Sequence, residues 1–74
     1  MSRLPRLTAR ELIRNLERLG YSIVRTSGGH AHMAHPTRPG RITIPVHAGK
    51  VIGPGLLRAI LRQARLRAED VAQK

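Results

Sequence analysis

The chain has 74 residues, the size of one small domain, and its lack of cysteine excludes disulfide bonds and thiolate metal sites. Lys and Arg number 14 against four Asp and Glu, and the resulting formal charge of +10 predicts a polyanionic partner, first of all nucleic acid. No apolar run approaches the roughly 20 residues of a membrane span, and the N-terminal residues form no apolar signal core, so we expect a cytoplasmic protein.

The first predicted element is a helix that begins after Thr8 and ends at Gly20. Thr8 is a candidate N-cap, and Glu11 three residues later completes a capping box. Gly20 suits the left-handed position that follows a helix. Apolar residues recur at the spacing of one helical face, namely Leu12, Ile13, Leu16 and Leu19. Arginines recur on another face of the same helix, namely Arg10, Arg14 and Arg18.

Two strands joined by a tight turn are predicted next, over residues 21–27 and 30–35. Alternation in the first strand places Tyr21, Ile23 and Arg25 on one face. Gly28-Gly29 marks the turn, so the two strands form a hairpin. Alternation divides the second strand into His30, His32 and Ala34 on one face and Ala31, Met33 and His35 on the other.

A third strand over residues 41–46 and a second helix complete the predicted elements. Pro45 limits backbone pairing and indicates a sheet edge or a strand end. Pro54 suits the first position of the second helix, and a short terminal turn is predicted over residues 66–72. The apolar face of the third strand consists of Ile42, Ile44 and Val46. The apolar stripe of the second helix consists of Leu56, Leu57, Ile60, Leu61 and Ala64, and its solvent side carries Arg58, Arg62 and Arg65.

This order of elements predicts the α+β class, as a small two-layer α-β-β-β-α sandwich. A three-stranded antiparallel sheet would carry both helices on one face, because the helical leucines and the apolar strand residues must cover each other. We expect a single domain over residues 1–74, with residues 1–6 and 68–74 frayed.

The histidines raise the question of a metal site. His30 and His32 share a strand face, and His47 is a candidate third ligand. Zinc takes three or four ligands supported by carboxylates or carbonyls. The chain has no cysteine, its four acidic residues lie in the predicted helices and the tail, and a charge of +10 repels a dication. We therefore expect no metal ion and no other cofactor.

Catalysis by His30 is the second possibility, beside its being an ordinary polar residue of a strand. A neutral imidazole accepts a proton near neutral pH. In RNA, a base that takes the 2′-OH proton allows in-line attack, which yields a 2′,3′-cyclic phosphate and a free 5′-OH. The glycine turn lets backbone N–H groups approach a phosphate closely. His47 is a second candidate as general acid, phosphate contact or loop cap, and His35 is expected to have a surface role.

Charge and composition suggest how RNA would be held. Tyr21 is the one aromatic residue, so modules that stack single-stranded bases on several aromatic rings are not expected. RNA would instead be recognised through its phosphates, its sugars and its shape, and arginine side chains could also stack on bases. The candidate RNA-binding residues are Arg25, Ser27, Gly28, Gly29, His32, Lys50, Arg58 and Arg62.

Four motifs in one order carry a family resemblance. They are LERLGYSIVR (16–25), GGH (28–30), TIPVHAGK (43–50) and PGLLRAILRQA (54–64). With these motifs the chain resembles the HicA or YcfA-like toxins, which are mRNA interferases paired with a HicB antitoxin. The resemblance implies a double-stranded-RNA-binding-like fold, His30 as the catalytic residue, mRNA as substrate and a HicB-like antitoxin as partner. Gly29 stands where the family motif has serine, so the backbone alone would bind phosphate there.

Three hypotheses of function follow. The first is the toxin of a type II toxin–antitoxin system, an endoribonuclease that arrests translation and growth. The second is a non-catalytic RNA-binding module of the same fold, which holds RNA by shape and phosphate. The third is a basic protein that binds only an acidic protein partner.

Overall fold

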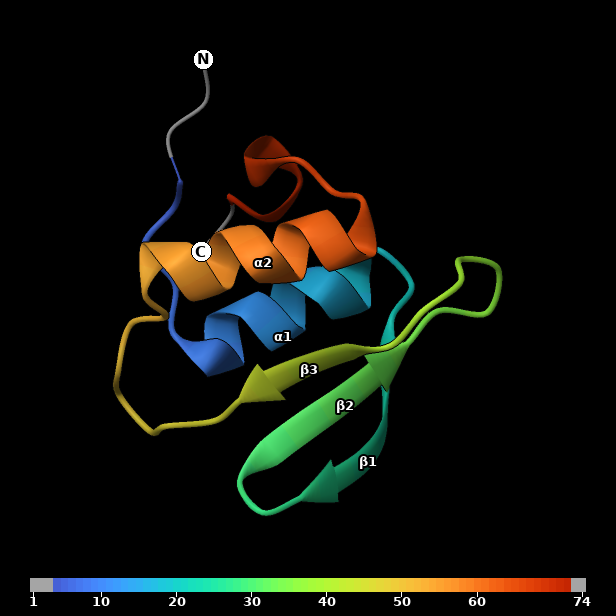
Figure 1. Cartoon of the computed structure of the whole chain (residues 1–74), viewed down its shortest axis with the longest axis horizontal. Coiled ribbons are helices and arrows are strands. Elements are labelled where there is room, and N and C mark those ends of the chain that lie inside the picture. Colours follow the sequence, from blue (N-terminus) through green and yellow to red (C-terminus); the bar gives the residue numbers. More distant parts are fainter. Residues whose placement is uncertain (1–3, 73–74) are drawn as a thin grey trace.

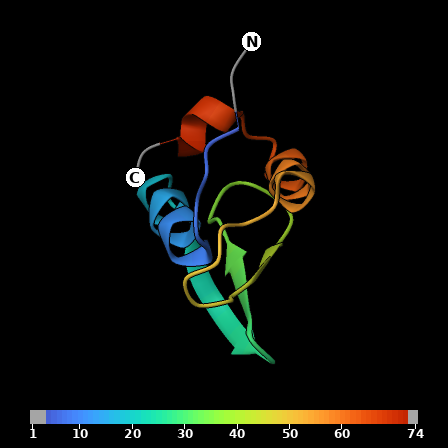
Figure 2. The ribbon, with the colours of Figure 1, turned by 90° about the vertical axis from the view of Figure 1, so that its left-hand side faces the viewer.

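The architecture is the predicted α-β-β-β-α sandwich (Figure 1). The computed structural model describes residues 4–72, with α1 (Ala9–Arg18), β1 (Ser22–Ser27), β2 (His30–Ala34), β3 (Ile42–Pro45), α2 (Pro54–Ala64) and the 3-10 turn η1 (Ala68–Val71). The strands form an antiparallel sheet in the order β1-β2-β3. Figure 2 shows both helices at one end of the molecule, with the β1–β2 hairpin extending away from them. Within residues 4–72 no helix has the length and apolar character needed to cross a membrane.

The start and end of α1 follow the predicted signals. The N–H of Glu11 donates to Thr8 Oγ1 at 3.2 Å, and the N–H of Thr8 donates to Glu11 Oε1 at 2.9 Å, which completes the capping box. Leu12 and Leu16 are fully buried. Gly20 follows the helix with φ of 102°, a conformation that glycine adopts without strain.

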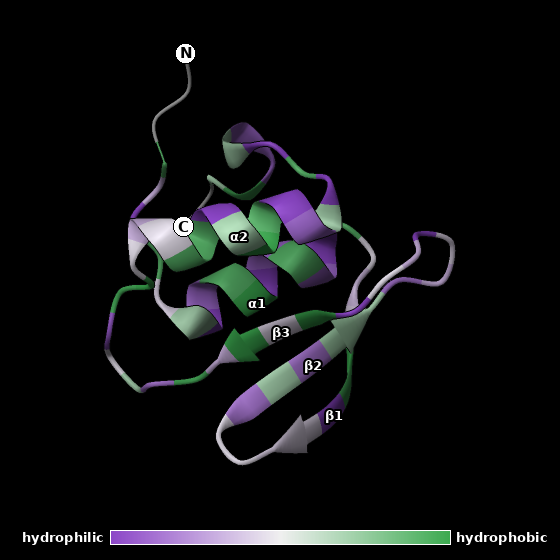
Figure 3. Cartoon of the chain, viewed as in Figure 1, coloured by the Kyte–Doolittle hydropathy of each residue, from purple (hydrophilic) through white to green (hydrophobic). Residues whose placement is uncertain are grey.

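The hydrophobic core lies between the helices and one face of the sheet. Hydrophobic and hydrophilic residues alternate along β2 (Figure 3), and the core-facing ones are buried as predicted. Two expected core residues are exposed instead: Val46 follows the last residue of β3, and Leu56 lines a hollow with the loop that precedes α2. The largest fully buried side chains are Leu7, Leu12, Leu16, Met33, Ile42, Ile44, Leu57, Ile60 and Val71.

The alternation predicted for β1 is interrupted by a bulge. Ile23 lies opposite Met33, Arg25 lies opposite His32, and the register shifts between the two pairs. Opposite residues of an antiparallel pair share a face, and an extra residue in one strand moves the next side chain to the other face. The prediction that Ile23 and Arg25 share a face is therefore wrong, and Arg25 lies on the histidine side of the sheet.

The C-terminal segment is held against α1 by a buried amide. Asn15 donates from Nδ2 to the carbonyl of Val71 at 2.9 Å, and its Oδ1 accepts a hydrogen bond from Arg18 at 2.9 Å. The short turn predicted over residues 66–72 is confirmed as η1. Of the ends expected to fray, residues 1–3 and 73–74 lie outside the described residues, and fraying of the others stays a prediction.

Candidate functional site

A two-residue turn places His30 at the start of β2. Gly28 and Gly29 have φ of 56° and 78°, and Ser27 and His30 are paired on either side of them. Positive φ at both central positions is typical of a type I′ hairpin turn. A Cβ at either glycine would meet no atom within 4 Å, so the backbone conformation, rather than crowding, favours glycine here.

The imidazole of His30 is held by the same turn. Its Nδ1 lies 3.1 Å from the carbonyl oxygen of Gly28. A carbonyl oxygen only accepts, so this bond requires the proton to be on Nδ1. In the neutral ring Nε2 therefore carries the lone pair. Because the side chain is exposed, this nitrogen is available as a proton acceptor.

The sheet face opposite the helices gathers several predicted site residues. Cross-strand pairing arranges them in two adjacent rows, Ser27–His30–Pro45 and Arg25–His32–Thr43. Residues directly opposite each other share a face, with Cβ atoms about 4.5–5.5 Å apart. We call this surface the histidine face and define it by Arg25, Ser27, His30, His32 and Thr43.

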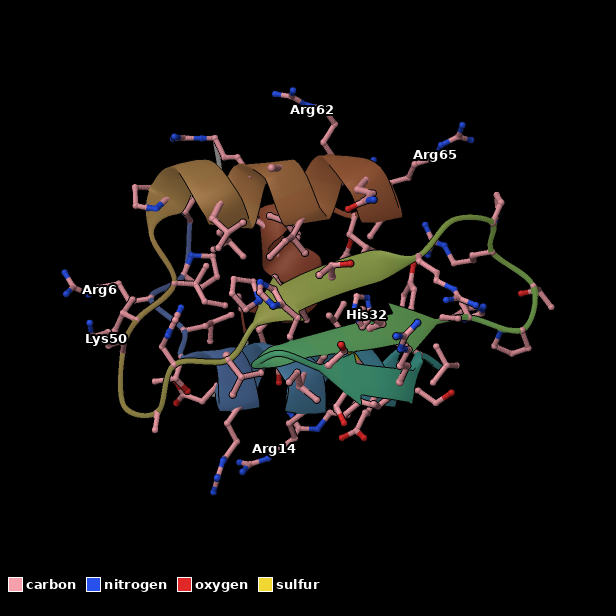
Figure 4. All side chains as sticks on the ribbon, turned by 60° about the horizontal axis from the view of Figure 1, so that its bottom comes forward. Arg6, Arg14, His32, Lys50, Arg62 and Arg65 are labelled. Atoms are coloured by element: carbon pink, nitrogen blue, oxygen red, sulfur yellow. The ribbon has the colours of Figure 1, made fainter. Side chains whose placement is uncertain are left out.

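His32 lies in the middle of the histidine face. It is half-buried, and its Nδ1 lies 3.2 Å from the hydroxyl of Thr43 on β3. Figure 4 labels it over β2. The hydroxyl limits the rotation of this ring, so His32 presents a fixed polar group beside His30.

His35 is part of the structural framework, and its predicted surface role is wrong. The ring is half-buried; its Nε2 donates to the carbonyl of Leu19 at 3.0 Å, while its Nδ1 accepts from the N–H groups of Thr37 at 3.1 Å and Arg38 at 3.2 Å. The ring also packs edge-on against Tyr21, with centroids 5.0 Å apart. Since both nitrogens are occupied, His35 ties the end of α1 to the loop after β2.

The histidines thus divide between the two sides of the sheet. His30 and His32 lie on the histidine face, and His35 turns toward α1. In residues 4–72, no group of three or more His, Cys, Asp or Glu side chains is arranged to hold a metal ion.

The loop after β3 brings two more predicted residues to the same end of the sheet. The N–H of Val46 donates to the carbonyl of Gly29 at 2.7 Å, so the loop begins beside the glycine turn. His47 and Lys50 line a common hollow of about 120 Å³. That hollow also contains Pro45, which pairs with His30 across β2 and β3. His47 and Lys50 therefore lie near the end of the sheet where His30, the first residue of β2, pairs with Pro45.

The arginines of α2 lie elsewhere. In Figure 4, Arg62 and Arg65 project from α2 away from the sheet and from His32. Arg58 is exposed one turn before Arg62, which places it on the same outer side of the helix. The buried side of α2 faces the core, so the predicted RNA-binding residues form two separate groups rather than one patch.

Two cationic residues near the loop of residues 46–50, Arg6 and Arg10, were not among the candidate site residues predicted from the sequence. The N–H of Ile52 donates to the carbonyl of Leu7 at 2.7 Å, and Figure 4 shows Arg6 and Lys50 projecting on the same side. Arg10 lines a second hollow together with His47. The helical pattern located Arg10 on α1, but these neighbours come from distant parts of the chain, and no local signal reveals them.

The chain matches a known protein family. A profile of the family described as HicA toxin of bacterial toxin-antitoxin matches residues 9–66. The matched segment includes α1, the whole sheet, α2 and every candidate site residue predicted from the sequence. A comparison with curated proteins gives no match.

Proposed function

The chain belongs to the HicA family, the toxins of bacterial toxin–antitoxin systems, and we propose that it is an endoribonuclease that cleaves mRNA without a metal ion. His30 is the general base. The observation that carries this proposal is the hydrogen bond from His30 Nδ1 to the Gly28 carbonyl, which leaves Nε2 as an exposed proton acceptor. The charge of +10 favours a polyanionic substrate.

The proposed reaction is an internal transfer on the RNA backbone. Nε2 of His30 takes the proton of a 2′-OH, and the 2′-oxygen attacks the adjacent phosphorus. The bond from phosphorus to the 5′-oxygen breaks, which leaves a 2′,3′-cyclic phosphate on one product. The leaving 5′-oxygen takes a proton and becomes a free 5′-OH. His47 is the candidate general acid for that proton, because its loop starts beside the glycine turn.

Cations and hydrogen-bond donors near His30 stabilise the charge that develops on the phosphoryl oxygens. Arg25 lies in the row next to His30 and offers a planar guanidinium. Ser27, opposite His30, offers a hydroxyl, and Lys50 adds charge from the loop. The backbone of Gly28 and Gly29 approaches a phosphate from the turn, where no side chain intervenes.

The remaining candidate residues position the RNA. His32, fixed by Thr43, contacts the strand beside the cleavage point. Arg58 and Arg62, on the outer side of α2, bind phosphates farther along the RNA. The substrate thus passes from the histidine face around the molecule to α2.

Substitution of the proposed base tests the mechanism. In His30→Ala, we expect the rate of mRNA cleavage in vitro to fall by about 10²–10⁴-fold, because the general base is lost. RNA binding, followed by fluorescence anisotropy, stays within about twofold, since phosphate contacts provide most of the affinity. The matched control is His32→Ala, which removes an imidazole from the same face and keeps a measurable cleavage rate. Cleavage by His30→Ala at the wild-type rate rules out His30 as the base.

Chelation and product analysis test the absence of a metal from the mechanism. We expect an unchanged cleavage rate in EDTA, and products that end in a 2′,3′-cyclic phosphate and a 5′-OH, because imidazole supplies the proton transfer that a metal-bound hydroxide otherwise provides. Mass spectrometry of a cleaved oligoribonucleotide identifies the ends. Loss of activity in EDTA that zinc or magnesium restores contradicts the proposal.

A non-catalytic RNA-binding module is the second candidate function. The observation in its favour is the group of exposed α2 arginines, which lies apart from His30. Under this alternative, His30→Ala arrests growth as the wild type does. Unchanged growth arrest together with no detectable RNA cleavage by either protein supports the binding module.

The antitoxin of this system is proposed to be HicB-like and to act on the histidine face. A toxin of a toxin–antitoxin system has an antitoxin partner, and the net charge of +10 suits carboxylates on that partner. Covering His30 would block the substrate and neutralise the nearby cations in one step.

A further inference from the structure

A second and larger hollow lies beside the loop that carries His47. Its volume is about 400 Å³, and its walls are the first residues of α1 and the loop of residues 46–49. Arg10 is the cationic residue among those that line it, and His47 lines both this hollow and the smaller one that contains Lys50. One histidine residue therefore borders both spaces.

The composition of the chain limits what can recognise an RNA base. Bases outside a helix are bound by stacking on aromatic rings or guanidinium planes and by hydrogen bonds to their edges. Tyr21, the one aromatic residue, is only 4% exposed and packs against His35. Stacking of a base at this site therefore depends on arginine and histidine side chains.

Arg10 has the chemistry and the position for this task. It is exposed and is one of the residues that line the hollow. Its N–H donors form a rigid fork that pairs with two adjacent acceptors. Among the bases, guanine presents such a pair in O6 and N7.

The position of His47 indicates which nucleotide is bound. The loop that carries His47 starts at the hydrogen bond between Val46 and Gly29, next to His30. A nucleotide whose 5′-oxygen lies near His47 can extend its base into the larger hollow. This is the nucleotide on the 3′ side of the scissile phosphate, since its 5′-oxygen is the leaving group.

We propose that the hollow lined by Arg10 and His47 binds the base on the 3′ side of the cleaved bond, and that Arg10 makes this base preferentially guanine. This inference rests on the proposed ribonuclease function. It adds a base-binding site that determines where in the RNA the protein cuts.

Cleavage of a random-sequence RNA pool tests the inference. Sequencing of the 5′-OH ends gives the base frequency at each position around the cut. We expect the wild type to show a preference for guanine immediately 3′ of the cut. In Arg10→Ala and in Arg10→Lys this preference falls by about tenfold, because removal of a specific base interaction has an effect of that order. Arg10→Lys separates the planar fork from the positive charge, which lysine retains.

The matched control is Arg14→Ala, which removes the same charge one turn farther along α1. It leaves the preference at every position as in the wild type. A wild-type pool with no base preference 3′ of the cut, or an unchanged guanine preference in Arg10→Ala, overturns the inference while the ribonuclease function stands. A wild type that cleaves no RNA overturns the proposed function, and the base-binding site falls with it.

Discussion

The chemistry of His30 depends on a backbone carbonyl two residues earlier. Many exposed histidines can carry their proton on either nitrogen. Here the bond of 3.1 Å to the Gly28 carbonyl selects Nδ1 and directs Nε2 outward. His35 shows the opposite case, because its two nitrogens are both bonded to the backbone. Two histidines five positions apart in sequence therefore have different roles, one proposed to be catalytic and one structural.

Gly20 is a second residue whose neighbours determine its identity. A Cβ at this position would lie 2.7 Å from Nε2 of His35, and φ is 102°. We predict that Gly20→Ala lowers the free energy of unfolding by about 2 kcal/mol, because it introduces both backbone strain and a clash with a hydrogen-bonded ring. Urea denaturation measures the change.

Gly55 provides the matched control for this prediction. It lies in the first turn of α2 without a positive φ, and a Cβ there would meet no atom within 4 Å. Gly55→Ala is expected to raise the free energy of unfolding by about 0.5–1 kcal/mol, because alanine restricts the unfolded chain. Equal effects of the two substitutions would contradict the role assigned to His35.

The bulge in β1 brings Arg25 to the histidine face. Without the register shift between Ile23 and Arg25, strict alternation would turn Arg25 toward the helices. The extra residue sends Arg25 to the side of His32 instead. A local irregularity in one edge strand thereby adds a cation to the proposed cleavage site.

The end of α2 depends on a loop between two strands. Arg38 donates from one guanidinium nitrogen to the carbonyls of Ala64 at 3.1 Å and Arg65 at 3.0 Å. These carbonyls lie at the C-terminus of the helix, where cations are favourable. We predict that Arg38→Ala lowers the free energy of unfolding by about 1–2 kcal/mol in thermal denaturation, because both hydrogen bonds disappear.

Arg41 in the same loop is the control for charge. Its side chain is exposed, and Arg41→Ala removes the same charge at a position away from the end of the helix. Its effect is expected to stay within about 0.5 kcal/mol. A loss of stability in Arg41→Ala as large as in Arg38→Ala would assign the effect to net charge instead of to the helix end.

Cationic side chains project from several sides of the molecule instead of forming a single patch. Figure 4 shows Arg62 and Arg65 projecting from one side, Arg14 from the opposite side, and Arg6 with Lys50 from a third. Under the proposed function, these cations attract RNA from more than one side of the molecule. Under the proposed function, the histidine face and the loop of residues 46–50 then determine where the bound RNA is cut.

The proposed binding of Arg62 to a phosphate predicts a change in salt dependence. Removing one interaction between a cationic side chain and a phosphate reduces the slope of log K against log salt by about 1. Arg62→Ala should show this reduction between 50 and 200 mM salt, with an unchanged cleavage rate at saturating RNA, because Arg62 lies away from His30.

Gln63→Ala is the control, since Gln63 is an exposed and uncharged neighbour on α2. It keeps the wild-type slope. If Arg62→Ala also keeps that slope, the RNA does not reach the outer side of α2. A fall in the saturated cleavage rate in Arg62→Ala would place this arginine at the reacting centre.

Local patterns in the sequence were sufficient for the helices, the hairpin and the fold class. The capping box at Thr8, the glycine after α1 and the alternation in β2 depend on residues that are close in the chain, so they can be recognised from the sequence alone. The position of His30 directly after a glycine turn was readable for the same reason. Val46 and Leu56 were wrongly assigned to the core, because apolar character alone does not show where the sheet ends or which helical side chains cover it.

Contacts between distant segments depended on the folded chain. The bulge that turns Arg25 toward His32, the two hydrogen-bonded nitrogens of His35 and the hollow shared by Arg10 and His47 all arise from packing between separate elements. Such contacts have no local sequence signal, because register and loop position are set by the whole core. The sequence thus placed the proposed catalytic histidine, His30, two residues after the Gly28 carbonyl that selects its tautomer, and the fold determined its neighbour Arg25 and the hollow beside His47.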